Sequence, residues 1–475
     1  MKKIKFVLPI LIVVLPFVYY FWFIFHYLIQ VEYPDSFAYL WRQSFNFYYL
    51  TGRSLTQRVI FTISGNNAEI ISIVQLIFYL FTAISLYFLL SDGKGFGYKL
   101  FSALFISFLF SSYTLNVSAV VINSEPIFVS LIILVTFWLF LYRGPYRYVT
   151  VFLVAVAFLL SKNTAPYYLI LLIVMWFVTL PKYLCNKKNI LFYSLLVLIA
   201  LGRMHITNLY DTSIDVNVLN NAYRRIFIDP KTVAVFHDKY DMPTGIFVEQ
   251  CRGEWIGVPC LGYNVLAIDQ ESQNYVLVED ETGFVYWIKN SGQEAYLKYL
   301  LIDEPMGTLN KYSQAFQKLS SRSNTIQFMI DYLGVEIRTN QPNNLTKIKE
   351  LGKESGFFGF DVLSVLHTFL LNFGFNHAGL VGLYAFIGWV VLHRFRFIEY
   401  FPLAISMLCC SLGLFFLTFF GDGMEIRRHV FPSFVLLTLG GTLYLLSWLR
   451  ISFFIAKSGL AFACTRLASL RSASG

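Results

Sequence analysis

Two carboxylates, Glu32 and Asp35, lie three residues apart in the stretch QVEYPDSFAYLWRQ, which follows the first long apolar run of the chain. One helical turn would place both on the same side. A carboxylate at the mouth of an apolar cavity is partly desolvated, which raises its pKa and suits it to act as a general base toward a hydroxyl group. Two other roles stay open for Asp35, because it is also placed to bind a metal ion or to cap a helix that begins at Ser36.

A cationic cluster in the sequence GDGMEIRRHVFP precedes the last long apolar segment. Arg427 and Arg428 suit a phosphate or pyrophosphate group, because a guanidinium binds phosphate oxygens through a planar fork, and His429 would extend that site. Asp422 and Glu425 lie in the same stretch and are further site candidates. Alternatively, these two acids neutralise the arginines and form an ordinary salt-bridge cluster in a loop.

Three more charged residues lie on the predicted outer side, where charge at the edge of a membrane tends to mark function. Arg58, in TGRSLTQRV, is placed to bind a lipid phosphate or to extend toward lipid headgroups. Glu125, in NSEPIF, opens a helix with a proline in its first turn, where the helix dipole favours an acid, so a structural role is equally open. Lys162, in LSKNTAPYYL, is either a phosphate ligand or an ordinary lysine at a membrane boundary.

Long apolar segments must position these residues. Of 475 residues, 57% are hydrophobic and only 14% are charged, whereas soluble proteins usually carry about 25% charge. Several runs reach the roughly 20 apolar residues that cross a bilayer, and they predict a polytopic α-helical membrane protein with about 10 transmembrane helices. The first run has no small-residue cleavage site, and we expect it to be a retained helix. The apolar segments are 6–30, 69–90, 99–121, 125–142, 147–161, 164–180, 189–209, 377–393, 399–420 and 429–449.

Basic residues predict the orientation of these segments. With the N-terminus inside, every second loop carries Lys or Arg, as the positive-inside rule requires. The basic residues of these loops include Lys2, Lys94, Arg143, Lys187, Arg394 and Arg450. Cytoplasmic loops therefore explain the net charge of +9, and nucleic acid is not an expected partner. The same orientation places the candidate residues above on the outer side of the membrane.

The segment 209–356 interrupts the apolar pattern and predicts an inserted extracytoplasmic α+β domain. KTVAVFH and ETGFVYWIKN have the residue types of short strands, whereas SGQEAYLKYLLIDE and LNKYSQAFQKLSSRS have helical spacing. Cys251 and Cys260 lie in this domain, where an oxidising compartment would permit a disulfide between them. The remaining divisions are an N-terminal transmembrane module 1–208 with a first outer loop of interfacial helices 31–68, an interfacial helix 357–376, C-terminal transmembrane helices 377–450 and a cytoplasmic tail 451–475.

The order and placement of these elements resemble the GT-C class of integral-membrane glycosyltransferases, which take sugars from polyprenyl- or dolichyl-phosphate donors. The resemblance rests on the acid in EYPDS, the amphipathic stretch FAYLWRQSFNFYYL, the SEPIF and SKNTAPYYL elements, and the late outer loop EIRRHVFP. It covers the membrane part of the chain. The first loop departs from the commonest paired-acid form of the class, because a Tyr-Pro pair separates Glu32 from Asp35.

The resemblance implies an inverting transferase that moves a sugar from a polyprenyl-phosphate donor to a hydroxyl group of a glycan, lipid or protein. It implies Asp35 as the base or metal ligand, and basic residues on the same face for the donor phosphate. Whether a divalent metal takes part stays open. The expected location is the bacterial cytoplasmic membrane with the site facing outward, and the endoplasmic reticulum membrane is the second option. The alternatives are a polymerase or ligase that uses a lipid-pyrophosphate glycan, a lipid or polysaccharide transporter, and a non-enzymatic assembly protein.

Overall fold

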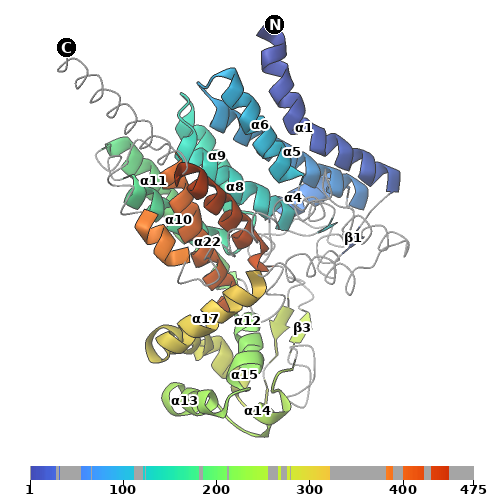
Figure 1. Cartoon of the computed structure of the whole chain (residues 1–475). Helices are drawn as coiled ribbons and strands as arrows, with labels where there is room; N and C mark the ends of the chain where they lie inside the picture. The colour runs from blue at the N-terminus through green and yellow to red at the C-terminus, as the bar shows by residue number, and fades with distance from the viewer. Residues whose placement is uncertain are drawn as a thin grey trace, which may run out of the picture.

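The protein is mostly helical, with a bundle of apolar helices and a smaller helical domain beyond one end of the bundle (Figure 1). The computed structural model describes residues 2–27, 31–32, 55–65, 67–111, 121–122, 125–180, 186–210, 213–254, 266–268, 275–278, 280–320, 381–388, 400–421 and 429–448. Statements below about what the structure contains apply to these residues.

The bundle contains four helices that are long and apolar enough to cross a membrane, namely Ile70–Ser91, Lys187–Thr207, Phe401–Gly421 and His429–Trp448. Its labelled helices are α1 (Lys2–Tyr27), α4 (Leu55–Ile63), α5 (Ala68–Ser91), α6 (Phe96–Phe110), α8 (Glu125–Leu141), α9 (Arg147–Leu159), α10 (Ala165–Thr179), α11 (Lys187–Tyr210) and α22 (Phe401–Gly421). Within the described part of the chain, further apolar helices such as α8 and α10 are shorter than a typical span. The four long helices indicate a membrane protein, and the total of about ten spans stays a prediction.

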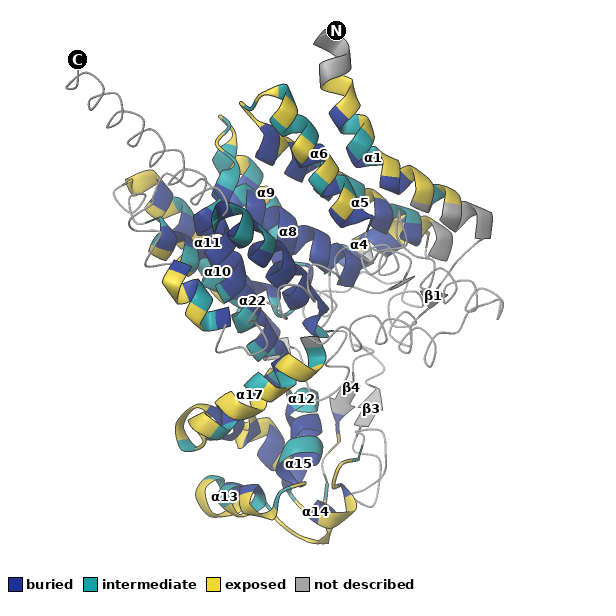
Figure 2. Ribbon diagram, viewed as in Figure 1, coloured by how far each residue is buried: buried dark blue, intermediate teal, exposed yellow. Residues whose placement is uncertain are grey.

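Helix α8 forms the centre of the bundle and is buried along nearly its whole length (Figure 2). A helix that is hydrophobic on every side is stable only when neighbours surround it. Here α5, α9 and α22 pack against α8, while α1 packs on α5 and α6, and α10 packs on α11 and α22. The first residue of α8 is the buried acid Glu125, so the most apolar helix of the bundle begins at a charge.

The domain beyond the bundle consists largely of helices and π-helical turns (Figure 1). Its elements are α12 (Ser213–Asn221), η2 (Ala222–Ile226), α13 (Pro230–Tyr240), α14 (Ile246–Gln250), β3 (Leu266–Ile268), β4 (Tyr275–Leu277), α15 (Phe284–Trp287), η3 (Ile288–Gly292), α16 (Gln293–Lys298), η4 (Tyr299–Asp303) and α17 (Pro305–Ser320). The strands β3 and β4 pair antiparallel. Aromatic rings form much of the core: Phe227 packs against Phe247 and Phe284, and Phe236 packs against Trp287.

Two segments that were expected to be strands are helices, and aspartate side chains that accept hydrogen bonds from their first backbone N–H groups explain the difference. KTVAVFH lies within α13, where Asp229 accepts a hydrogen bond from the Lys231 N–H at 3.2 Å and Pro230 occupies the first turn. ETGFVYWIKN enters α15 and η3, and Asp280 accepts a hydrogen bond from the Val285 N–H at 2.9 Å. These capping contacts outweigh the preference of β-branched and aromatic residues for strands.

The expected helices of the domain are confirmed. SGQEAYLKYLLIDE contains α16 and η4, and LNKYSQAFQKLSSRS lies in α17 as far as Ser320. Strands among the described residues of 209–356 are limited to β3 and β4, so the α+β class is not confirmed. Cys251 is buried and disulfide-bonded, and its partner lies outside the described residues. The predicted pairing with Cys260 therefore stays a prediction.

Side chains of this domain cap the last turn of α22. Asn221 Nδ2 donates to the Phe420 carbonyl at 3.1 Å, and the Arg225 guanidinium donates to the Phe419 carbonyl and lies 4.4 Å from the centre of the Phe419 ring. Tyr296 Oη donates to Asn221 Oδ1 at 3.3 Å and accepts from Arg225 Nη1 at 3.3 Å. The last carbonyl groups of a helix have no partners within it, so these contacts fix the domain to the end of the bundle.

Two short strands join distant parts of the N-terminal half. β1 (Val31–Glu32) follows α1, β2 (Val121–Ile122) precedes α8, and the two pair in parallel with Glu32 opposite Ile122. The segment that follows α1 thus begins beside the segment that leads into α8. The amphipathic stretch expected after Asp35, the interfacial helix expected at 357–376 and the tail 451–475 lie outside the described residues.

Candidate functional site

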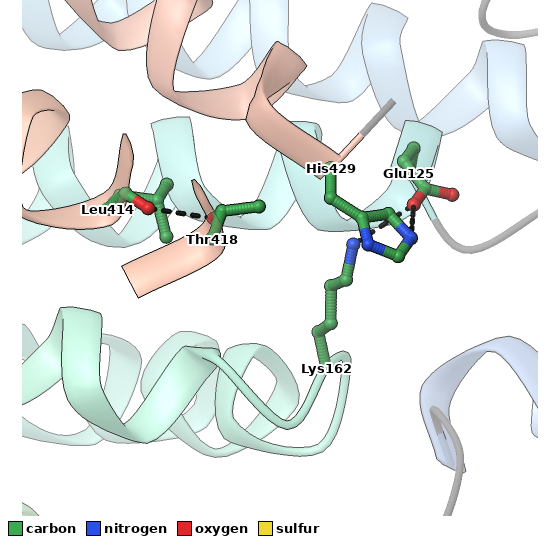
Figure 3. Close-up of polar contacts among 5 residues, drawn as sticks. All are labelled: Glu125, Lys162, Leu414, Thr418 and His429. Carbon is green, nitrogen blue, oxygen red and sulfur yellow. Dashed lines mark hydrogen bonds and ion pairs between the residues drawn. The ribbon is translucent and has the colours of Figure 1, made fainter. Parts of the chain in front are cut away.

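Glu125, Lys162 and His429 meet where three helices of the bundle begin or end (Figure 3). Lys162 Nζ donates a hydrogen bond to Glu125 Oε1 at 3.0 Å, and His429 Nε2 lies 3.6 Å from the same oxygen. The three residues come from the start of α8, the turn between α9 and α10, and the start of the helix His429–Trp448. Three of the residues singled out in the sequence therefore belong to one cluster.

The local sequence holds these side chains at helix ends. Pro126 is the second residue of α8 and Pro166 is the second residue of α10, positions where proline is tolerated because the first N–H groups of a helix have no partner within it. Ser161 Oγ donates to the Phe158 carbonyl and helps to end α9 just before Lys162. Each charged residue thus lies next to a helix start or a helix end.

The pair of Glu125 and Lys162 is largely removed from water. The Glu125 side chain is 4% exposed, whereas those of Lys162 and His429 are 17% and 21% exposed. A buried carboxylate is costly unless it is paired, and the ammonium group of Lys162 together with the dipole of α8 provides that stabilisation. Lys162 Nζ also lies 5.5 Å from the centre of the Phe128 ring, a cation–π contact. The cluster is therefore an acid whose partners reach toward the surface.

Arg203 adds a further cation on the same side and was missed by the sequence reasoning. Its Nη2 donates to Asn163 Oδ1 at 3.3 Å, and Asn163 is the residue after Lys162. Arg203 is 9% exposed and belongs to α11. Arg203 lies within the apolar segment 189–209, and a charged residue inside such a segment is itself a signal of function.

The backbone segments of two other candidates, Glu32 and Arg58, lie near the cluster. Glu32 lies in β1 opposite Ile122, three residues before Glu125. Arg58 belongs to α4, and the N–H of Thr56 in the same helix donates to the Leu160 carbonyl at 3.2 Å, two residues before Lys162. Both segments therefore reach the same end of the bundle, and the side chains of Glu32 and Arg58 are not described.

The remaining predicted site residues lie outside the described part of the chain. They are Asp35, Asp422, Glu425, Arg427 and Arg428. Their roles stay predictions. The segment 422–428 nevertheless joins α22 to His429, so it connects the capped end of α22 to the cluster.

The described residues contain no group of three or more His, Cys, Asp or Glu side chains arranged to hold a metal ion. The cluster presents instead the ammonium group of Lys162 and the imidazole of His429 around a buried acid, where the apolar helices end. Such an arrangement suits an anionic group, since lysine and histidine donate hydrogen bonds to phosphate and carboxylate oxygens. No family model, curated protein or solved structure matches this chain.

Proposed function

We propose that the protein is an inverting glycosyltransferase of the GT-C type, which moves a sugar from a polyprenyl-phosphate donor to an acceptor hydroxyl group. The observation that supports this most is the meeting of Glu125, Lys162 and His429 at one end of the apolar bundle. A polyprenyl-phosphate donor needs an apolar environment for its tail and donor groups for its phosphate. The cluster offers such donors where the apolar helices end.

In the proposed reaction the acceptor hydroxyl loses its proton to a carboxylate of the first outer loop, Asp35 or Glu32. The hydroxyl oxygen forms a bond to the anomeric carbon of the sugar, and the bond from that carbon to the phosphate oxygen breaks on the opposite face. The electron pair of the broken bond leaves with the polyprenyl phosphate. Attack from the opposite face inverts the configuration of the anomeric carbon.

The basic residues are assigned to the leaving phosphate. Lys162 and His429 stabilise its developing charge, and Arg427, Arg428 and Arg58 are proposed to join them from neighbouring segments. Glu125 acts as a positioning residue, because its Oε1 accepts a hydrogen bond from Lys162 at 3.0 Å and lies 3.6 Å from His429 Nε2. Asp422 and Glu425 neutralise the adjacent arginines when no donor is bound.

The proposal includes the orientation of the chain. About ten helices cross the membrane, the N-terminus is cytoplasmic, and the domain 209–356 lies on the outer side of a bacterial cytoplasmic membrane. The acceptor, which is a glycan, a lipid or a protein, approaches from that side. The distribution of basic residues between alternate loops supports this orientation.

The test is sugar transfer by the purified full-length protein in detergent, with a panel of radiolabelled polyprenyl-phosphate sugars and a mixture of glycan and lipid acceptors. Asp35→Asn is expected to abolish transfer without changing the melting temperature. Lys162→Met should reduce transfer, whereas Lys94→Met, in the loop between α5 and α6, serves as the matched control and should not. Wild-type turnover by Asp35→Asn would remove that residue from the mechanism.

Two other results would replace the proposal. Turnover only with lipid-pyrophosphate glycans would favour a polymerase or ligase. Movement of a lipid-linked sugar across proteoliposomes without any transfer would identify a transporter.

A further inference from the structure

Helix α17 of the outward domain packs along the side of α22 through an aromatic stripe. Tyr312 and Phe316, one turn apart, are buried, and their rings lie 5.2 Å and 5.1 Å from the ring of Phe415. The Phe316 ring also lies 6.0 Å from that of Phe434 in the helix His429–Trp448. Helix α17 therefore packs against two candidate membrane spans, α22 and His429–Trp448.

The contact with α22 occurs far from the end of that helix. Tyr312 Oη donates to the Leu412 carbonyl at 2.9 Å. Leu412 lies nine residues before Gly421, which corresponds to about 13 Å along the axis, and the 21 residues of α22 extend about 31 Å in total. The hydrocarbon core of a bilayer is about 30 Å thick. If α22 crosses the membrane, Tyr312 lies at the level of the leaflet on the side of the domain.

The apolar stripe of α17 continues past this contact with exposed side chains. Leu309 precedes Tyr312 by three residues and Phe316 by seven, so it lies on the same side of the helix. Leu309 is 52% exposed and Met306 is 67% exposed. In the preceding turn Leu301 and Ile302 are exposed as well. This surface is defined here as the 301–309 surface and comprises Leu301, Ile302, Met306 and Leu309.

Most charges near this surface fit a lipid interface. Lys311 and Lys318 are exposed and Pro305–Ser320 contains no acidic residue, while of the two acids in the preceding turn Asp303 pairs with Lys239 and Glu304 is exposed. An amphipathic helix with a basic polar side and a separate apolar side is typical of helices that lie in the membrane interface, where lysine contacts anionic headgroups.

We propose that the 301–309 surface is a lipid-binding surface that enters the boundary between headgroups and acyl chains of the leaflet on the side of the outward domain. The domain is thereby held against the membrane at two places, through Arg225 and Asn221 at the end of α22 and through the 301–309 surface on lipid. The proposal depends on α22 crossing the membrane and is independent of the chemistry of the candidate site.

The test uses spin labels on the full-length protein in vesicles of phosphatidylcholine and phosphatidylglycerol. Met306→Cys and Leu309→Cys are labelled in a background where Cys185, Cys409, Cys410 and Cys464 are replaced by Ala. Ile246→Cys is the matched control, because Ile246 is also an exposed apolar residue, 79% exposed, on α14, which lies at the far end of the domain in Figure 1. Collision with oxygen, which concentrates in lipid, is compared with collision with a water-soluble nickel chelate.

The ratio of oxygen to nickel collision at positions 306 and 309 should exceed that at position 246 by at least about threefold. Equal ratios at the three positions would overturn the proposal, because they would place the surface in water. Low collision with both reagents together with dipolar broadening would also overturn it, since a second copy of the chain would then cover the surface. The readout does not involve sugar transfer, so it distinguishes this proposal from the proposed function.

Discussion

Replacement of Glu125 by Gln removes the charge that neutralises Lys162 in the candidate site. The substitution keeps the size of the side chain and leaves the ammonium group of Lys162 in a site where its side chain is only 17% exposed. Removing one partner of a buried ion pair costs about 3–5 kcal/mol, because the other charge stays buried without compensation. Lys162 is partly exposed and flexible, so the lower end, about 3 kcal/mol, is expected for Glu125→Gln.

The same reasoning predicts a rescue. Lys162→Met removes the ammonium group, so the double variant Glu125→Gln with Lys162→Met should be less destabilised than the sum of the two single variants. A coupling energy of about 2 kcal/mol is expected for two groups in direct contact. The measurement is equilibrium unfolding in mixed micelles of all four proteins of the cycle.

The matched control is Glu294→Gln in the domain beyond the bundle. Glu294 also pairs with a lysine, Lys298, at 2.6 Å, but both side chains are more than half exposed. Solvent screens such pairs, and this variant should unfold like the wild type. Additive effects at Glu125 and Lys162, or an effect at Glu125 no larger than at Glu294, would show that the buried pair does not stabilise the fold and would refute the reasoning.

Three further predictions concern the domain beyond the bundle. Arg225→Ala should speed amide hydrogen exchange in the last turn of α22, because it removes the guanidinium that donates to the Phe419 carbonyl, whereas unchanged exchange would mean that the cap is not needed. Asp229→Ala should destabilise the domain by about 1 kcal/mol in thermal melts, because it removes the cap of α13. The hydrogen bonds from the Thr232 hydroxyl and nearby N–H groups lower the pKa of Asp229. The Asp229 carboxylate therefore stabilises the fold above about pH 4, and this stabilisation is lost as the pH falls through the lowered pKa. Asp229→Asn should keep the cap of α13 but remove this dependence of stability on acid pH. Peptide mapping without reductant should find Cys251 linked to Cys260. A disulfide that closes this short loop should stabilise the fold by about 2.5 kcal/mol. A different partner for Cys251 would contradict the pairing.

The meeting of Glu125, Lys162 and His429 could be anticipated because hydropathy and loop charge sort residues between two faces of a membrane. Glu125 and Lys162 stand at the starts of apolar segments on the predicted outer side, and His429 does the same. Their contact is then a matter of packing, which the sequence alone does not specify. The catalytic and binding roles of these residues remain proposals.

Other features were not accessible from the sequence for identifiable reasons. The pairing of Glu32 with Ile122 joins strands of two residues, which are too short to leave a periodic pattern. The residue types of KTVAVFH favour a strand, but the capping contact of Asp229 decides for a helix. Arg203 was hidden by the high hydropathy of the residues around it in α11, although its charge inside such a segment was a usable signal.

The most direct test of the central claim, that Glu125, Lys162 and His429 belong to a site for a lipid-linked phosphate, is a structure of the full-length protein with bound polyprenyl phosphate. We expect a phosphate within hydrogen-bonding distance of Lys162 or His429, with its tail beside the apolar helices. A phosphate bound at the opposite end of the bundle, where α10 ends and α11 begins, would contradict it.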